Sequence, residues 1–214
     1  MTTIAIDIQP QYRFSCMAAN EKRFLHQPEN IVDELNRQAR LADKRVLIEN
    51  IGSTSGFFCQ SCIEAPLNRS GSVFGKMKDH CRSNHLFAGL PCPADYDHAV
   101  ETDGDYRHGV CFHDAKESRS TGLMEWLYRQ QADTVILGGL ATEEAVTNTA
   151  KQLMWYNRDL HVIVNLSACC GYTPETTLTA IADMRDLGIT VATHSAAIPA
   201  LSESFSLNAL LKVS

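Results

Sequence analysis

Short apolar runs alternate along much of the chain with segments whose apolar residues recur every three or four positions. The first pattern predicts buried strands, and the second predicts amphipathic helices that cover them. The predicted strands cover residues 4–8, 45–48, 110–112, 134–137, 161–166 and 189–192. The predicted helices cover residues 28–42, 121–131, 142–156 and 174–187. Pro28 and Pro174 each suit the first turn of a helix.

Nearly continuous apolar strands separated by helices are typical of a mostly parallel sheet covered on both faces. We therefore predict an α/β fold with three layers, α-β-α, of the doubly wound, Rossmann-like type. Ligands bind such sheets beyond the carboxyl ends of the strands, where the sequence places Asp7, His113 and the turns at 138–146 and 167–171. Residues 200–214 are expected to form either a packed helix or a dimer arm.

The segment from about residue 52 to 108 shows neither the apolar pattern of a strand nor that of a helix. It is rich in Gly, Ser, Pro, Cys and His. A chain of 214 residues is long enough for one α/β domain with a well-buried core. We predict a single domain, 1–214, that carries this segment as an irregular insertion.

Composition and charge exclude several classes of function. The net charge of -6 gives no basic surface, so neither nucleic acid nor an anionic membrane is an expected partner. No apolar stretch approaches the roughly 20 residues of a membrane span, and "MTTIAIDIQPQYRF" does not have the pattern of a signal peptide. We expect a cytoplasmic protein, in which the eight cysteines are thiols or metal ligands and not disulfides.

Asp7 stands in a strand that otherwise contains only Ile and Ala. A carboxylate in such a place is unfavourable unless it has a hydrogen-bond or charge partner. It is either a strand-end residue that stabilises the next loop or a general acid/base whose pKa is raised by burial.

Three segments resemble the isochorismatase-like hydrolase family, which includes nicotinamidases, other cysteine amidohydrolases and isochorismatases. They are "IAIDIQPQYRF", "VILGGLATEEAVTNTA" and "HVIVNLSACCGYTPE". The resemblance extends over residues 4–14 and 121–194 and fails between about 50 and 120. It implies the isochorismatase-like fold and a hydrolase that acts on a small molecule and requires no cofactor for catalysis.

The resemblance also implies roles for individual residues. Asp7 matches the family's catalytic acid/base, and Gln9 and Phe14 match residues that shape the neighbouring loop. Ala145 falls at the nucleophilic cysteine of the amidohydrolases, and a methyl group cannot attack a carbonyl. Isochorismatases also lack that cysteine and hydrolyse a vinyl ether after protonation by the acidic residue.

The strand-to-helix turn "GGLATEEAV" would serve as a holder of backbone donors. The Leu140–Ala141 bond falls where the family has a cis peptide. In the family this turn directs N–H groups at an oxyanion, and the donors here would be those of Ala141 and Ala145. Glu143 stands where the family usually has Asp.

A third family residue, a lysine just past the strand before the predicted helix at 121–131, would fall at Phe112 or His113. His113 would then either pair with Asp7 or form a local hydrogen bond. Lys116 follows in a loop, where it either returns to the site or is solvated.

Three other cysteines near the same edge are candidates to replace the nucleophilic cysteine that the family has at the position of Ala145. Cys169 and Cys170 follow the predicted strand at 161–166, and Cys111 ends another predicted strand. A reactive thiol needs a cation or a helix N-terminus to lower its pKa. Otherwise these cysteines are small buried residues.

The insertion carries a spacing that suits a structural zinc ion: Cys59 and Cys62 have a two-residue gap, and Cys81 and His85 a three-residue gap. The alternatives are a redox Cys-x-x-Cys pair, or buried thiols with surface histidines. The metal-binding segment of the family itself is absent.

The sequence thus leaves two functions open. One is a hydrolase of a small metabolite with Asp7 as its acid/base. The other is a catalytically inactive relative that binds a metabolite or acts as a scaffold. The run Leu153-Met154-Trp155-Tyr156 would present an apolar patch to a second copy in a homo-oligomer, or would belong to the core.

Overall fold

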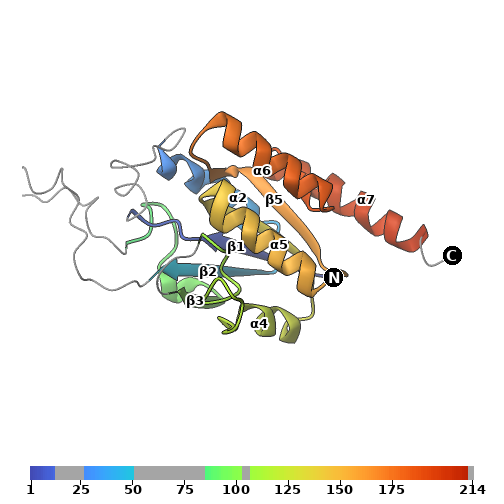
Figure 1. The fold of residues 1–214 in the computed structure, drawn as a ribbon, viewed down its shortest axis with the longest axis horizontal. Coiled ribbons are helices and arrows are strands. Elements are labelled where there is room, and N and C mark those ends of the chain that lie inside the picture. Colours follow the sequence, from blue (N-terminus) through green and yellow to red (C-terminus); the bar gives the residue numbers. More distant parts are fainter. Residues whose placement is uncertain (13–26, 51–84, 103–106, 212–214) are drawn as a thin grey trace, which may run out of the picture.

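Strand β1 (Thr2–Ile8) lies in the middle of a six-stranded sheet in which every neighbouring pair is parallel (Figure 1). The strand order is β3-β2-β1-β4-β5-β6. The other strands are β2 (Lys44–Asn50), β3 (His98–Thr102), β4 (Ala132–Leu140), β5 (His161–Cys170) and β6 (Thr190–Ala192). A computed structural model describes residues 1–12, 27–50, 85–102 and 107–211 of the chain.

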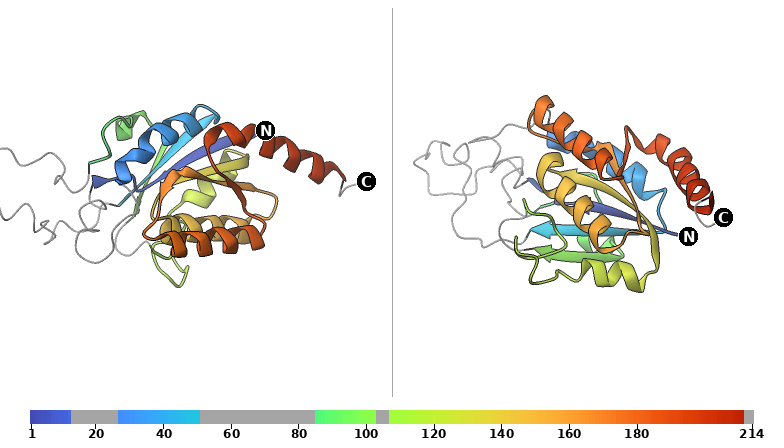
Figure 2. Two further views of the ribbon diagram at one scale, coloured as in Figure 1. Left: turned by 90° about the horizontal axis from the view of Figure 1, so that it is seen from above. Right: turned by 45° about the vertical axis from the view of Figure 1, so that its right-hand side comes forward.

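Helices pack on both faces of the sheet, as Figure 2 shows. The helices are α2 (Val32–Ala39), α4 (Leu123–Arg129), α5 (Thr147–Tyr156), α6 (Pro174–Asp186) and α7 (Ile198–Leu211). Shorter helical turns are η1 (Pro28–Ile31), η3 (Pro93–Asp95), the π-helical η4 (Thr142–Val146) and η5 (Ser195–Ala197). The predicted three-layer α/β fold is confirmed.

The main core lies between the sheet and helices α4, α5 and α6. Ile4, Ile6 and Ile8 of β1 face it, because successive side chains of a strand point to opposite faces. Leu127 of α4 and Met184 of α6 pack against the same face.

The opposite face is covered by α2 and by the start of α7. Leu35 of α2 packs with Leu140 and Ala168 at the carboxyl ends of β4 and β5. Ile198 of α7 packs with Ile136 of β4. Ala5 and Asp7, which alternate with the isoleucines of β1, therefore point toward this second layer.

Five predicted strands and four predicted helices are present with shifted ends, but the strand predicted at 110–112 is wrong. Phe112 forms an isolated bridge with Ser120, and the surrounding segment lies against α5, where Val110 N–H donates to Thr149. The sixth strand is β3, which lies inside the segment predicted to be irregular. Its burial alternates along an edge of the sheet, so it lacks the continuous apolar run of the central strands.

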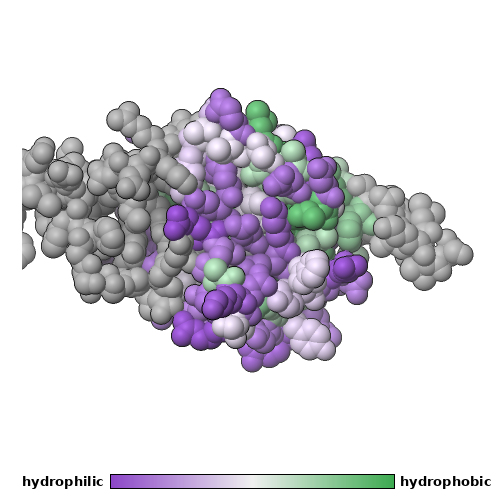
Figure 3. All heavy atoms as spheres, in the orientation of Figure 1, coloured by the Kyte–Doolittle hydropathy of each residue, from purple (hydrophilic) through white to green (hydrophobic). Residues whose placement is uncertain are grey.

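The segment predicted at 200–214 contains most of α7, which extends away from the sheet beyond its first turns (Figures 1 and 2). Phe205 stacks on His161 with ring centroids 3.9 Å apart. The face drawn in Figure 3 is mostly hydrophilic. Within the described ranges, no helix combines the length and apolar character needed to cross a membrane.

Candidate active site

The carboxyl ends of β1, β2, β3 and β4 meet at one edge of the sheet, and several buried polar residues gather there. Asp7, Gln9, Asn50 and Thr102 are each no more than 3% exposed. Ile8 pairs with Gly139 across the β1–β4 ladder, which places the end of β1 beside the turn that follows β4. This edge is where ligands bind in parallel α/β sheets.

Asp7 is fully buried and forms an ion pair with Arg45 of β2. Both Nε and Nη2 of Arg45 approach the same oxygen, Oδ2, at 2.8 Å and 2.6 Å. The hydroxyl of Tyr96 donates to this oxygen as well, at 3.0 Å. The carboxyl group therefore has strong partners on one oxygen, and they lie on the α2 side of the sheet.

Burial raises the pKa of Asp7 from 3.8 to about 6, against the opposing effects of the charge and hydrogen bonds of Arg45 and the hydroxyl of Tyr96. The other oxygen, Oδ1, accepts no hydrogen bond of ordinary geometry from the described residues. The amide of Gln38 is close enough to favour the ionised carboxyl slightly, although its Nε2 is itself without a well-formed hydrogen bond in this part of the chain. Asp7 thus has the raised pKa expected of a general acid/base near neutral pH.

Sequence analysis missed Arg45 and Tyr96. Arg45 lies at the beginning of a predicted strand, where a charged side chain is usually exposed to solvent. In the structure its side chain is only 14% exposed. Tyr96 lies two residues before β3, the strand that the sequence pattern did not predict, and the centre of its ring lies 5.0 Å from the Arg45 guanidinium carbon. Burial, followed by the charge of Asp7, raises the pKa of Tyr96, so its hydroxyl stays a donor. One sequence signal was present: a buried aspartate requires a partner.

The turn after β4 brings its backbone close to β1. The Leu140–Ala141 peptide is cis, as the resemblance implies. Gly139 has a φ of +136°, and a Cβ at this position would lie 2.0 Å from the carbonyl oxygen of Ile8. Only glycine permits this approach of β4 to β1.

Glu143 fixes the other side of the turn to the start of α6. Its Oε1 accepts from the backbone N–H of Tyr172 at 2.9 Å and from the hydroxyls of Thr176 and Thr177 at 2.8 Å each. Glu143 therefore links η4 to the first turn of α6 and to the residue Tyr172 before it.

Ala145 lies within η4 and is 1% exposed. Its methyl group belongs to the core on the α4–α5 side, together with Ile8. Asp7 points to the α2 side, so the structure does not bring the two side chains into one cluster. The donor roles of the Ala141 and Ala145 backbone N–H groups stay a prediction.

His113 and Lys116 lie in the loop after Phe112 and not at the end of a strand. The loop is held to α5 through Gln152, whose amide donates to Glu117 at 3.1 Å. The side chain of Lys116 is exposed, and its backbone N–H donates to Asp114. Asp7 is paired with Arg45, and a pairing of His113 with Asp7 stays a prediction.

The strand that precedes α4 in the sheet also differs from the predicted one, which bears on where the family's lysine would fall. The strand before α4 in the sheet is β3, which ends at Thr102. A residue just past that strand is residue 103, and 103–106 lie outside the described residues. The placement at Phe112 or His113 rests on the similarity of "STGLMEWL" to the family's segment and stays a prediction, although the strand predicted at 110–112 is absent.

The cysteines considered as displaced nucleophiles are all buried. Burial raises the pKa of Cys169 to about 12 and also raises that of Cys111. Cys170 is 1% exposed. These surroundings favour the neutral thiol over the reactive thiolate. A nucleophilic role for Cys169 or Cys170 gains no support from the geometry.

Of the predicted zinc ligands, Cys59, Cys62 and Cys81 lie outside the described residues. His85 is described and exposed, and its carbonyl accepts from the backbone N–H of Tyr12 at 3.0 Å. No group of three or more potential metal ligands occurs among residues 1–12, 27–50, 85–102 and 107–211.

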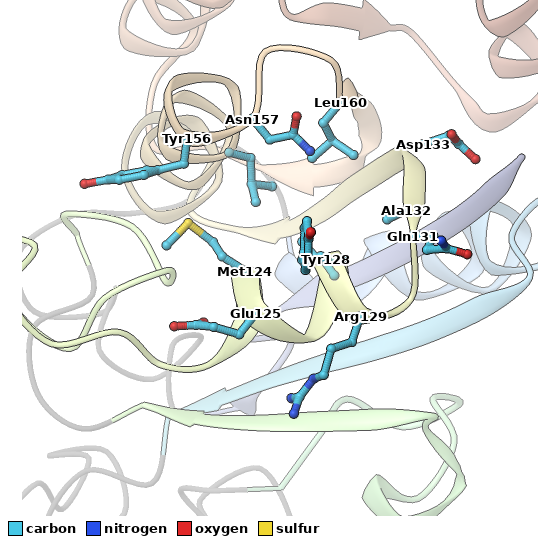
Figure 4. A pocket seen from close by; sticks show the side chains of 12 residues that line it. Met124, Glu125, Tyr128, Arg129, Gln131, Ala132, Asp133, Tyr156, Asn157 and Leu160 are labelled. Atoms are coloured by element: carbon cyan, nitrogen blue, oxygen red, sulfur yellow. The ribbon is translucent and has the colours of Figure 1, made fainter.

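An open groove of about 1060 Å³ lies between α4 and α5, near the amino-terminal end of β4, whereas Asp7 lies near the carboxyl end of β1. Figure 4 shows Met124 and Tyr128 of α4 across from Tyr156, near the start of β4 at Ala132. The groove is a surface feature separate from the candidate active site.

The Isochorismatase domain family model matches residues 103–196. No curated protein sequence matches the chain. Solved structures that resemble it include a nicotinamidase/pyrazinamidase from Acinetobacter baumanii, with a TM-score of 0.63, 16% identity and coverage of 92% of this chain and 98% of that one. An isochorismatase family protein from Desulfovibrio vulgaris gives a TM-score of 0.64, 17% identity and coverage of 94% and 98%.

A third structure, PnC1 from L. infantum in complex with nicotinate, gives a TM-score of 0.61, 16% identity and coverage of 89% and 91%. These similarities extend over nearly the whole of both chains. The chain therefore has the isochorismatase-like α/β fold.

Proposed function

We propose that the chain is a hydrolase of a small metabolite that works by proton transfer from Asp7 and not through a covalent intermediate. The observation that carries the proposal is the state of Asp7: it is a fully buried carboxyl whose Oδ1 has no well-formed hydrogen bond among the described residues, and it lies one residue before Ile8, which pairs with Gly139 at the end of the β1–β4 ladder. A carboxyl with a pKa of about 6 holds a proton in roughly a tenth of molecules at pH 7, about a hundredfold more than a carboxyl with the ordinary pKa of 3.8 would.

The side chains of the described residues near this turn favour a reaction without a covalent nucleophile. Ala145 has no group that can attack, and the nearby cysteines favour the neutral thiol. Asp7 would donate its proton to a carbon of the substrate double bond, and water would add to the oxocarbenium ion that forms. The proton released by water would return to the Asp7 carboxylate, and the C–O bond of the resulting hemiketal would break. A bond that protonation activates, such as that of a vinyl ether, suits this route better than an amide does.

The test is turnover of a panel of small amides, esters and vinyl ethers by the wild type and by Asp7→Asn. Asparagine keeps the size of the side chain but carries no transferable proton. We expect vinyl-ether hydrolysis by the wild type to fall by a factor of at least about 100 in Asp7→Asn, the range of general acid catalysis. Equal rates would remove Asp7 from the reaction.

A second candidate is a metabolite-binding relative without turnover. The observation in its favour is the ion pair with Arg45, which gives Asp7 a structural reason to persist. A ligand that binds at the edge and is recovered intact after long incubation would support this candidate against the first.

We also retain two proposals from the sequence. A structural zinc ion at Cys59, Cys62, Cys81 and His85 predicts close to one zinc per chain in elemental analysis of protein purified without added metal. A zinc content near zero would exclude it.

Assembly with a second copy is supported by aromatic residues on α4 and α5: Tyr128 is 85% exposed and Trp155 73% exposed. The wild type should have the mass of an oligomer in light scattering, and Tyr128→Ser with Trp155→Ser should shift it toward the monomer. A monomeric wild type would refute this proposal.

A further inference from the structure

Gln9, directly after β1, has a side chain whose orientation is fixed by its neighbours. Its Nε2 donates to the hydroxyl oxygen of Thr102 at 3.3 Å. That hydroxyl uses its only hydrogen to donate to the carbonyl of Glu49, at 3.1 Å. Thr102 can therefore only accept from Gln9, so the nitrogen of the amide must face Thr102 and the oxygen must face away.

The amide oxygen that results is buried without a donor. Gln9 is 0% exposed, and its Oε1 has no hydrogen-bond partner among the described residues. Buried amide oxygens in proteins nearly always accept at least one hydrogen bond, and an unpaired one is unfavourable. An acceptor without a donor among the described residues, at the edge where ligands bind, is placed to accept a hydrogen bond from a ligand.

The backbone holds Gln9 in this place. Its φ is +49°, which ends the strand, and its N–H donates to the carbonyl of Ile48 at 3.0 Å. The residue before it, Ile8, pairs with Gly139 in the last pair of the β1–β4 ladder, and Gly139 directly precedes the cis Leu140–Ala141 bond. Gln9 thus lies between the end of β3 and the turn after β4, two residues from Asp7.

We infer that Gln9 determines specificity by accepting a hydrogen bond from the substrate, and that the substrate class is a small molecule with an N–H or O–H donor. A ligand whose corresponding position holds only a carboxylate or a methyl group leaves Oε1 unpaired and binds more weakly. Binding sites that pair a buried polar group discriminate strongly against analogues that lack the matching group. This inference rests on the proposed site at the edge but not on proton transfer by Asp7.

The test uses two matched probe pairs, each differing in one donor: nicotinamide against 3-acetylpyridine, and 3-hydroxybenzoate against 3-methoxybenzoate. Calorimetric titration of the wild type should show at least tenfold tighter binding of the donor-bearing member of one pair. Gln9→Leu should reduce that preference to less than twofold. Thr102→Val, which releases the amide nitrogen and lets the amide turn, should reduce it severalfold.

Gln152→Leu is the matched control, because Gln152 is also a buried glutamine but lies on α5, where it binds the loop after residue 107. It should keep the donor preference of the wild type even if it lowers stability. The inference is refuted if the wild type discriminates neither pair, or if Gln9→Leu keeps the preference.

Asp7→Asn separates this inference from the proposed reaction. Loss of turnover with an intact donor preference in Asp7→Asn, together with loss of preference in Gln9→Leu, supports both. If Gln9→Leu loses the preference but Asp7→Asn turns over normally, the proton-transfer proposal fails and the role of Gln9 stands. If Gln9→Leu keeps the preference while Asp7→Asn loses turnover, the role of Gln9 fails alone.

Discussion

Arg45 and Asp7 lie on adjacent strands, and two guanidinium nitrogens of Arg45 approach the same carboxyl oxygen of Asp7. Nη2 of Arg45 is 2.6 Å from Oδ2 of Asp7, while Oδ1 stays without a well-formed hydrogen bond among the described residues. Nη1 of Arg45 donates to Asn36 of α2 at 3.0 Å, which fixes the guanidinium from the helix side. The ion pair thus holds Asp7 in place without occupying both of its oxygens.

The pH dependence of stability should carry the signature of Asp7. Its pKa in the folded chain is about 6, above the ordinary 3.8, so the folded state binds the proton more tightly than the unfolded state. The resulting contribution is fully present below about pH 4 and is lost as the pH rises through about 6. Because one pKa unit corresponds to about 1.4 kcal/mol, it amounts to about 3 kcal/mol at most.

This contribution is isolated by comparing the wild type with Asp7→Asn in urea unfolding at several pH values. His161 changes in the opposite direction, because burial lowers its pKa to about 4, and it is present in both proteins. Asp7→Asn should gain stability relative to the wild type as the pH rises from about 4 to 7. A constant difference would mean that the pKa of Asp7 is not raised.

Removing the cation should make the burial of Asp7 more unfavourable. Arg45→Met leaves the carboxylate without its ion-pair partner, and we expect a loss of about 2–4 kcal/mol at pH 8. At pH 5, where most Asp7 is protonated, the loss should be clearly smaller. Arg37→Met, which breaks the exposed pair with Glu34, is the control and should cost less than about 1 kcal/mol at both pH values. Equal losses of stability for Arg45→Met at both pH values would contradict the conclusion that Arg45 stabilises the ionised form of Asp7.

Gly139 should not tolerate a side chain. Gly139→Ala would place its Cβ 2.0 Å from the Ile8 carbonyl oxygen and should lower the free energy of unfolding by more than about 4 kcal/mol, or prevent folding. Gly122→Ala is the matched control: its φ is also positive, +87°, but nothing lies within 4 Å. It should cost only about 1–2 kcal/mol, measured by thermal unfolding. Similar costs at the two positions would rule out the close approach of β4 to β1.

Glu143 should be important for the stability of the turn after β4. Glu143→Ala removes the acceptor of three hydrogen bonds and should cost about 2–3 kcal/mol, or roughly 5–10 °C in Tm. The neighbouring Glu144, whose carboxylate accepts from the Tyr172 hydroxyl at 3.1 Å, provides the comparison. Glu144→Ala should lower the Tm by less than half as much, and the reverse order would show that Glu143 does not hold the turn.

The local pattern of the sequence was sufficient for most of the fold and for part of the site. Continuous apolar runs determined β1, β4 and β5, because strands buried on both faces carry apolar residues on both. The resemblance placed the cis peptide at Leu140–Ala141, which the structure contains, and the loss of a nucleophile at Ala145 stays a prediction. An edge strand such as β3 gives a weaker signal, which is why it was missed and the loop at 110–112 was taken for it.

Only the tertiary structure decided which groups Asp7 meets. Asp7 pairs with Leu47, so Arg45, two residues earlier in β2, points to the same face and reaches the carboxyl. Likewise, the register between β2 and β3 places Thr102 beside Asn50, at the level where it meets Gln9. Strand register depends on contacts between segments far apart in the chain, so periodicity, which reports only the burial of each segment, could not have predicted either pair.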